Sequence, residues 1–186
     1  QCWTPSRAKG VLVVGGHLGW SFYGQPAWGY IGICRHPGDR VASLYNYLRK
    51  KEWDVWSRHG LDRNSLERTL EQSPLFRRLV KNSQCEYLSG YGNFEATLRH
   101  IRSHNYLVAR LESITLVASM LSQKLDLKDS RLKQQNAGIA GYREQLDINA
   151  NAQAMIADLT GEDQALFDYI SSQPDGIFCS ISDRNW

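Results

Sequence analysis

Short apolar runs are separated by longer stretches of mixed polarity along this chain. The first run is Val-Leu-Val-Val at residues 11–14, followed by two glycines; the second is Tyr-Ile-Gly-Ile-Cys at 30–34, and the third is Tyr-Leu-Val-Ala at 106–109. Apolar runs of four or five residues that are closed by turn residues are typical of strands buried on both faces. We therefore predict three strands of a parallel sheet.

The stretches between these runs repeat apolar residues at helical spacing. Pro37 stands where the first turn of a helix tolerates it, and Asn93 and Thr160 are residue types that cap helices. Asp163 follows Thr160, near the positive end of the dipole of the last predicted helix. Alternating strands and helices predict an α/β fold, a parallel β-sheet flanked by helices. The inner faces of the four helices are Val41, Leu44, Tyr45 and Leu48; Phe94, Leu98 and Ile101; Val117, Met120, Leu121 and Leu125; and Leu166, Phe167 and Ile170.

Two segments break this alternation. Residues 51–84 are polar with weak helical patterns, and we interpret them as a helical insertion. Residues 128–150 contain two glycines and no sustained period, which predicts a loop. With 186 residues, 42% of them hydrophobic, the chain is long enough for one domain with a substantial core, spanning residues 1–186.

The charge balance is mild. The formal net charge is +3, which suits an anionic ligand without requiring nucleic acid. The basic residues of 99–110 and 124–133 are mixed with acids, so we predict solvated faces there and no nucleic-acid partner. No run of about 18 apolar residues is present, and the sequence therefore predicts no membrane span.

Four cysteines are spread widely along the chain, at Cys2, Cys34, Cys85 and Cys179. None belongs to a CxxC pair, the spacing that many metal sites use, and four in 186 residues are too few for a disulfide scaffold. We predict no metal ion and mostly reduced thiols. One long-range disulfide through Cys2 or Cys179 stays open.

The junction after the second predicted strand carries the residues best suited to bind a phosphate. Arg35 stands at the strand exit, Arg40 in the first helical turn, and Ser43 about one turn later. Helix N-termini favour anions, and the planar guanidinium of arginine matches phosphate oxygens. The alternative is structural: the arginines pair with Asp39 or other carboxylates, and the serine faces solvent.

The exit of the first predicted strand carries a histidine between glycines, in Gly15-Gly16-His17-Leu18-Gly19. A neutral imidazole at this place can take a proton from an attacking hydroxyl group, because its usual pKa is close to neutral pH. A lone histidine in a turn is more often structural. The hypothesis of a general base therefore depends on the neighbouring strand exit.

These two strand exits together resemble a known family. The order is Gly-His-Leu-Gly at 16–19, a short aromatic loop, and Tyr-Ile-x-x-x-Arg-x-Pro-x-x-Arg-x-x-Ser-Leu-Tyr-x-Tyr-Leu-Arg at 30–49. It is similar to the carbohydrate-type family 2 sulfotransferases, the group that contains the heparan sulfate and uronyl 2-O-sulfotransferases and many bacterial relatives. Looser matches within residues 10–172 are Asn82-x-Gln84, Tyr87-Leu88-x-Gly90, Glu112, Gln135-Asn136 and Asp163-x-x-Leu166-Phe167-x-Tyr169.

The resemblance implies a fold and a reaction. The fold would be the P-loop NTPase-like sulfotransferase fold, and the co-substrate 3′-phosphoadenosine 5′-phosphosulfate. The acceptor would be a hydroxyl group of a glycan or similar molecule, and the chemistry requires no metal ion. Arg35 and Ser43 match the residues that grip the 3′-phosphate of the donor in this family. His17 matches the histidine that is proposed as the general base.

Four further residues are candidates for supporting roles. Glu112 and Asn136 match recurrent positions of the family, and we add Arg40 as a supporting phosphate or salt-bridge contact. Trp20 is an acceptor-side candidate, because an exposed aromatic ring can stack on a sugar. The same reasoning applies to all tryptophans in predicted loops or insertions, for each of which packing is an equally good explanation: Trp20, Trp28, Trp53 and Trp56.

One expected element is missing from the pattern. The family holds the 5′-phosphosulfate with a loop that follows an earlier strand and carries a lysine, upstream of Gly-His-Leu-Gly. Here Lys9 precedes a predicted strand rather than following one, so it does not match that lysine. We expect the earlier strand and loop to precede Gln1 in the full protein. The alternative is a chain that lacks them and is not a working transferase.

Other functions stay open beside the transferase. A degenerate, non-catalytic module that binds an anionic nucleotide or a sulfated glycan through Arg35 and Arg40 is the main alternative. A kinase-like protein would need a Walker-type glycine-rich loop with its lysine, which the sequence lacks. By its resemblance to bacterial relatives we expect a cytoplasmic protein, with the Golgi lumen as the alternative if an upstream anchor was removed. Whether it forms a homo-oligomer is left open.

Overall fold

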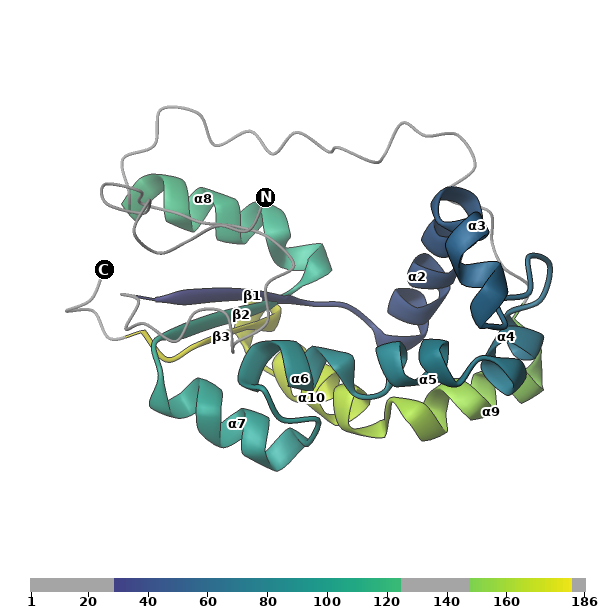
Figure 1. Cartoon of the computed structure of the whole chain (residues 1–186). Helices are drawn as coiled ribbons and strands as arrows, with labels where there is room; N and C mark the ends of the chain where they lie inside the picture. The colour runs from purple at the N-terminus through teal and green to yellow at the C-terminus, as the bar shows by residue number, and fades with distance from the viewer. Residues whose placement is uncertain (1–28, 125–147, 182–186) are drawn as a thin grey trace, which may run out of the picture.

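The described residues form a mostly helical structure around a small mixed sheet (Figure 1). The computed structural model describes residues 29–124 and 148–181. The strands β1 (Tyr30–Cys34), β2 (Tyr106–Arg110) and β3 (Ile177–Cys179) lie in the order β1-β2-β3. β1 is parallel to β2, with Cys34 opposite Arg110, and β3 is antiparallel to β2. The α-helices are α2 (Pro37–Lys51), α3 (Trp53–Trp56), α4 (Leu66–Gln72), α5 (Pro74–Val80), α6 (Ser83–Ser89), α7 (Phe94–Ser103), α8 (Ile114–Lys124), α9 (Ala150–Leu159) and α10 (Gly161–Ser171), and the 3₁₀-helices are η2 (Ser57–His59), η3 (Leu111–Ser113) and η4 (Pro174–Gly176).

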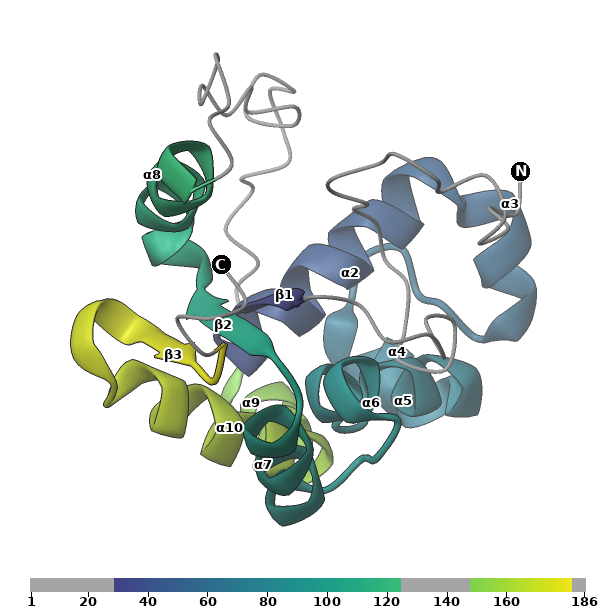
Figure 2. The same ribbon diagram turned by 90° about the vertical axis from the view of Figure 1, so that its left-hand side faces the viewer.

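Helices cover both faces of the sheet. Alternate residues of β2 point to opposite faces, and all but the last of them are buried. One face, with Leu107 and Ala109, packs against Val117 of α8. The other face, which includes Val108, packs against α6, α7 and α10. Figure 2 shows α8 on one side of the sheet and α7 and α10 on the other. The cluster on that second face contains Cys34, Cys85, Leu98, Ile101, Tyr106, Val108, Leu166 and Ile170.

A separate core holds together the helices beside the sheet. The helix α2 leaves the carboxyl end of β1 and packs against α9 and the short helices of residues 51–84 (Figure 1). Tyr45 and Phe76 are fully buried there, and their rings pack edge to face with 6.4 Å between the ring centroids. The hydroxyl of Tyr45 donates to the carbonyl of Asp62 at 2.8 Å, which satisfies its polar end. This core fixes the direction in which α2 leaves the sheet.

The strands predicted at 30–34 and 106–109 are present, and they are parallel as expected. The helix after Asn93 is also present, and the side chain of Asn93 accepts from the amide of Ala96 as a cap. The run at 11–14 lies outside the described residues. β3 was not predicted, and its antiparallel direction makes the sheet mixed rather than parallel.

Two details of the C-terminal prediction are wrong. The predicted loop 128–150 lies mostly outside the described residues, but its last residue, Ala150, begins α9, whose cap is the side chain of Asn149. Thr160 occupies the cap position of α10, as predicted, but its side chain makes no cap bond, because its hydroxyl donates to the carbonyl of Ile156 in the preceding helix. Hydroxyls of this kind often bond back to the preceding turn. Within the described ranges, no helix is long and apolar enough to cross a membrane.

Candidate functional site

The carboxyl ends of β1 and β2 adjoin, and the predicted phosphate-binding residues follow β1. Because the two strands are parallel and in register, Arg35 after β1 and Glu112 after β2 leave the same edge of the sheet. Pro37 is the first residue of α2, where its missing N–H costs nothing. The fifteen residues of α2 then direct its positive end toward this edge.

The backbone of Arg35 is clamped by the side chain of Gln84. The amide of Arg35 donates to Oε1 of Gln84 at 2.8 Å, and Nε2 of Gln84 donates to the carbonyl of Arg35 at 2.9 Å. The guanidinium of Arg35 has no hydrogen-bond or ion-pair partner among the residues that the structure describes. The backbone of Arg35 is therefore fixed, and within the described residues its guanidinium keeps all its hydrogen-bonding capacity.

Helix α6, which carries Gln84, is capped from α10. Asp163, which is 1% exposed, accepts from the amides of Gln84 at 3.0 Å and Cys85 at 2.8 Å. In return, Oδ1 of Asn82 accepts from the amide of Glu162 at 3.2 Å. Burial raises the pKa of Asp163, while the hydrogen bonds from the two amides and the positive charge of Arg40 in α2 oppose this rise. Asp163 lies in the first turn of its own helix, as predicted, and its carboxylate in addition binds the start of another helix.

Arg40 contacts the same helix by a different route. Its Nη1 donates to Oγ of Ser83 at 2.6 Å, and its guanidinium lies 5.6 Å from the ring centroid of Tyr87. Burial lowers the pKa of Arg40, and the charge of Asp163 opposes this change. A guanidinium stays charged at any working pH. Arg40 thus adds a positive charge near the start of α2, while its hydrogen bond is made to Ser83 within the protein.

The remaining predicted site residues fall into two groups. Ser43 lies in the second turn of α2, is half-buried, and has no hydrogen-bond partner for its hydroxyl within residues 29–124 and 148–181. Glu112 is exposed in η3. His17, Trp20 and Asn136 lie outside the described residues.

The tryptophans of the insertion are partly buried. Trp53 and Trp56 both pack against the core around α2, and the guanidinium of Arg63 lies 5.6 Å from the ring centroid of Trp53. This packing favours the structural explanation for these two rings over sugar stacking.

The thiols near the junction are not suited to nucleophilic chemistry. Burial raises the pKa of Cys34 to about 12 and raises that of Cys85 as well, so both stay protonated. Cys34, Cys85 and Cys179 are free thiols. No group of three or more metal-binding side chains lies close together in the described part of the chain.

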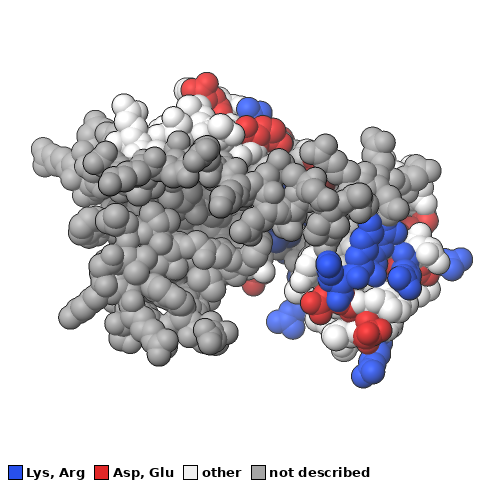
Figure 3. Space-filling view, turned by 90° about the horizontal axis from the view of Figure 1, so that it is seen from above, with Lys and Arg blue, Asp and Glu red and all other residues white. Residues whose placement is uncertain are grey.

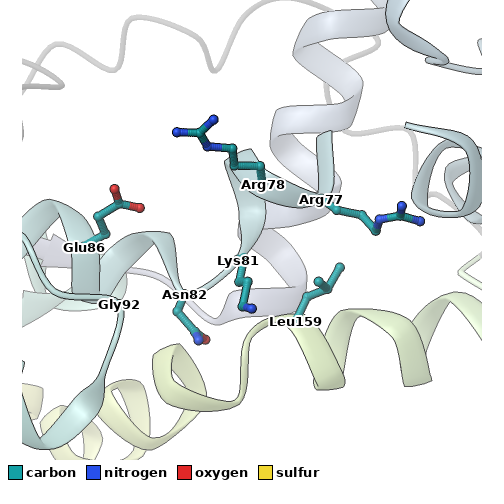
Figure 4. Close-up of a pocket in the computed structure, with 7 residues that line it drawn as sticks. All are labelled: Arg77, Arg78, Lys81, Asn82, Glu86, Gly92 and Leu159. Atoms are coloured by element: carbon teal, nitrogen blue, oxygen red, sulfur yellow. The ribbon is translucent and has the colours of Figure 1, made fainter. Parts of the chain in front are cut away.

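A second feature, which we call the cationic groove, lies at the turn between α5 and α6. It encloses about 450 Å³ and is lined by Arg77, Arg78, Lys81, Asn82, Glu86, Gly92 and Leu159 (Figure 4). Arg77 is held by the carbonyls of Leu70 and Glu71, each 2.9 Å from its Nη1. Figure 4 shows Arg77 and Arg78 pointing away from each other, so their charges do not converge on one point. The groove therefore has basic residues and one acid at its rim, but they do not form a converged anion site.

Lysine and arginine side chains also gather at the end of the molecule that holds α2 to α4, with some carboxylates among them (Figure 3). The last turn of α2 contributes Arg49, Lys50 and Lys51 to the charge of this region.

No family model, curated protein or solved structure matches this chain. The motif residues and the geometry of the β1–α2 junction are therefore the observations that bear on function.

The sequence pattern missed the roles of Gln84 and Asp163, although both stand in motifs that resemble the family. A spacing of 79 residues separates them, and no local pattern indicates that the amide of one meets the carboxylate of the other. Their polarity was the available signal. A glutamine and an aspartate that are both buried must find partners inside the protein.

Proposed function

We propose that this chain is most of the catalytic domain of a sulfotransferase that transfers a sulfuryl group from 3′-phosphoadenosine 5′-phosphosulfate to a hydroxyl group of a glycan or similar acceptor. Under this proposal the fold is P-loop NTPase-like. The observation that carries the proposal is the β1–α2 junction. Arg35 has a clamped backbone and an unpartnered guanidinium in the described structure, beside the start of a long helix that carries the unpartnered hydroxyl of Ser43.

The physical chemistry of this junction suits a phosphate monoester. A guanidinium and a hydroxyl supply several donors to the phosphate oxygens, and charge-assisted hydrogen bonds of this kind are about twice as strong as neutral ones. The positive end of α2 and the half-buried charge of Arg40 add attraction for a doubly charged group. In our proposal the 3′-phosphate of the donor lies here.

The proposed reaction is an in-line displacement at sulfur. A bond forms between the acceptor oxygen and sulfur, the bond from sulfur to the 5′-phosphate oxygen breaks, and adenosine 3′,5′-bisphosphate leaves. His17 would take the proton of the acceptor hydroxyl group. Positioning and charge stabilisation supply most of the rate enhancement in such transfers, and a general base adds about a hundred- to ten-thousand-fold.

The first experiment measures nucleotide binding by isothermal titration calorimetry. Adenosine 3′,5′-bisphosphate is expected to bind more tightly than adenosine 5′-monophosphate, which lacks the 3′-phosphate. Arg35→Gln is expected to weaken binding of the bisphosphate about 10- to 100-fold, the value of one charged hydrogen bond. The matched control is Arg99→Gln on the exposed face of α7, which should change nothing. Equal binding of the two nucleotides by the wild-type protein would refute the phosphate site.

A second experiment separates catalysis from binding. The full-length protein is incubated with labelled donor and a panel of glycans, and transfer of label is measured. His17→Ala is expected to lower turnover about a hundred-fold or more while leaving bisphosphate binding unchanged.

The alternative is a non-catalytic module that binds an anionic nucleotide or a sulfated glycan through Arg35 and Arg40, and it is supported by the same junction, which needs no catalytic residue to hold an anion. It predicts bisphosphate binding that survives His17→Ala, with no turnover in either protein.

A further inference from the structure

The side-chain amide of Asn46 is buried in the middle of α2 without satisfying its oxygen. The residue is 4% exposed, and its Oδ1 has no hydrogen-bond partner in the described part of the chain. Most buried polar atoms in proteins have a partner, and leaving one unpaired is unfavourable. A buried acceptor without a partner is one that either a bound water or a donor group of a ligand can satisfy.

The position of Asn46 links it to the proposed phosphate site. Residues three apart on a helix are neighbours on its surface, with about 5–6 Å between their Cβ atoms, so Asn46 lies next to Ser43. Val41, Tyr45 and Leu48 mark the stripe of α2 that packs into the helical core. At 100° per residue, Ser43 and Asn46 lie on a face turned away from that stripe. Asn46 is thus a buried polar side chain that the helical core does not account for.

We propose that Asn46 accepts a hydrogen bond from the 2′-hydroxyl of the donor ribose. This inference rests on the proposed function, which places the 3′-phosphate at Arg35 and Ser43. The 2′-hydroxyl is carried by the carbon next to the one that bears the 3′-phosphate, so it lies within one helical turn of a phosphate bound at Ser43. The 2′-hydroxyl can donate the hydrogen bond that Oδ1 of Asn46 otherwise does not receive. Asn46 then selects ribonucleotides over 2′-deoxyribonucleotides.

The test compares two ligands and three proteins by calorimetry. The ligands are adenosine 3′,5′-bisphosphate and its 2′-deoxy analogue, and the proteins are the wild type, Asn46→Ala and the exposed control Asn64→Ala. The wild type and the control are expected to prefer the ribonucleotide about 3- to 10-fold, the value of one neutral hydrogen bond. Asn46→Ala is expected to bind both ligands equally, and its thermal midpoint shows whether it is folded.

The outcomes separate this inference from the proposed function. Tight binding of both ligands with no preference in the wild type overturns the role of Asn46 and leaves the phosphate site standing; this comparison needs no variant. A preference that persists in folded Asn46→Ala overturns it as well. If the wild type binds neither nucleotide, the proposed function fails and the inference fails with it.

Discussion

Asp163→Ala is expected to be among the most destabilising single substitutions in this protein. The carboxylate accepts two backbone amides at the start of α6, those of Gln84 and Cys85. Asn82 occupies the cap position of α6, but its side chain makes no cap bond to the first turn of that helix. No neighbouring side chain therefore replaces the carboxylate of Asp163 as acceptor for these amides. The alanine variant leaves two buried donors without an acceptor.

The magnitude follows from these two hydrogen bonds. An unsatisfied buried donor costs about 1–3 kcal/mol, so the two donors together should cost the variant about 2–6 kcal/mol of its free energy of unfolding. Urea slopes of small proteins are about 1–3 kcal/mol per molar, so a slope of about 2 places the loss at roughly 1–3 M in the urea midpoint. Asp163→Asn keeps one acceptor oxygen and should lose about half as much.

The assay is urea unfolding followed by far-UV circular dichroism. Asp168→Ala is the matched control, because Asp168 is exposed on the same helix and its recorded side-chain bond is to Gln164. Its free energy of unfolding should stay within about 0.5 kcal/mol of the wild type. If Asp163→Ala and Asp168→Ala have the same midpoint, the cap from α10 does not hold α6 in place.

Two further predictions concern the backbone and pH. Gly176 has φ 65°, and a Cβ at this position would overlap the guanidinium of Arg110. Gly176→Ala should therefore lower the free energy of unfolding, measured with urea or heat, by about 1–3 kcal/mol. The control is Gly161→Ala, whose Cβ would meet nothing within 4 Å and which should be neutral or slightly stabilising. Burial lowers the pKa of His100, so below pH 6.5 the unfolded chain binds more protons than the folded one and stability falls as the pH falls. Between pH 7.5 and 5.5 the thermal midpoint of the wild type should therefore drop by more than that of His100→Gln. The control His59→Gln, which removes an exposed histidine, should drop as much as the wild type. Equal drops in all three proteins would contradict a lowered pKa of His100.

The features that could be predicted from the sequence are those with a local cause. The run at 30–34 is a strand because its apolar residues are bounded by turn residues, and Asn93 begins a helix because its side chain caps the first turn. The helix at 150–159 escaped prediction because its alanines give weak periodicity, although Asn149 offered a cap signal. The three residues of β3 are too few to form a pattern.

The candidate site divides in the same way. The pattern after β1 placed Arg35 and Ser43 at a strand-to-helix junction, and the structure has that junction. The side chains that hold it come from distant segments, since Gln84 is 49 residues from Arg35 and Asp163 is 79 residues from Gln84. Such contacts depend on the packing of α6 against α10, which no window of sequence contains.

The cap from α10 also orders events during protein synthesis. Chains emerge from the ribosome with the N-terminal part first. Arg35 and Gln84 are therefore exposed to solvent, protease and chaperone before the carboxylate of Asp163 has been translated. A nascent chain halted before residue 163 should be cleaved readily around α6, and one extended past α10 should resist. Under the proposed function, the junction would then become competent for nucleotide only late in translation, when the C-terminal helices have docked.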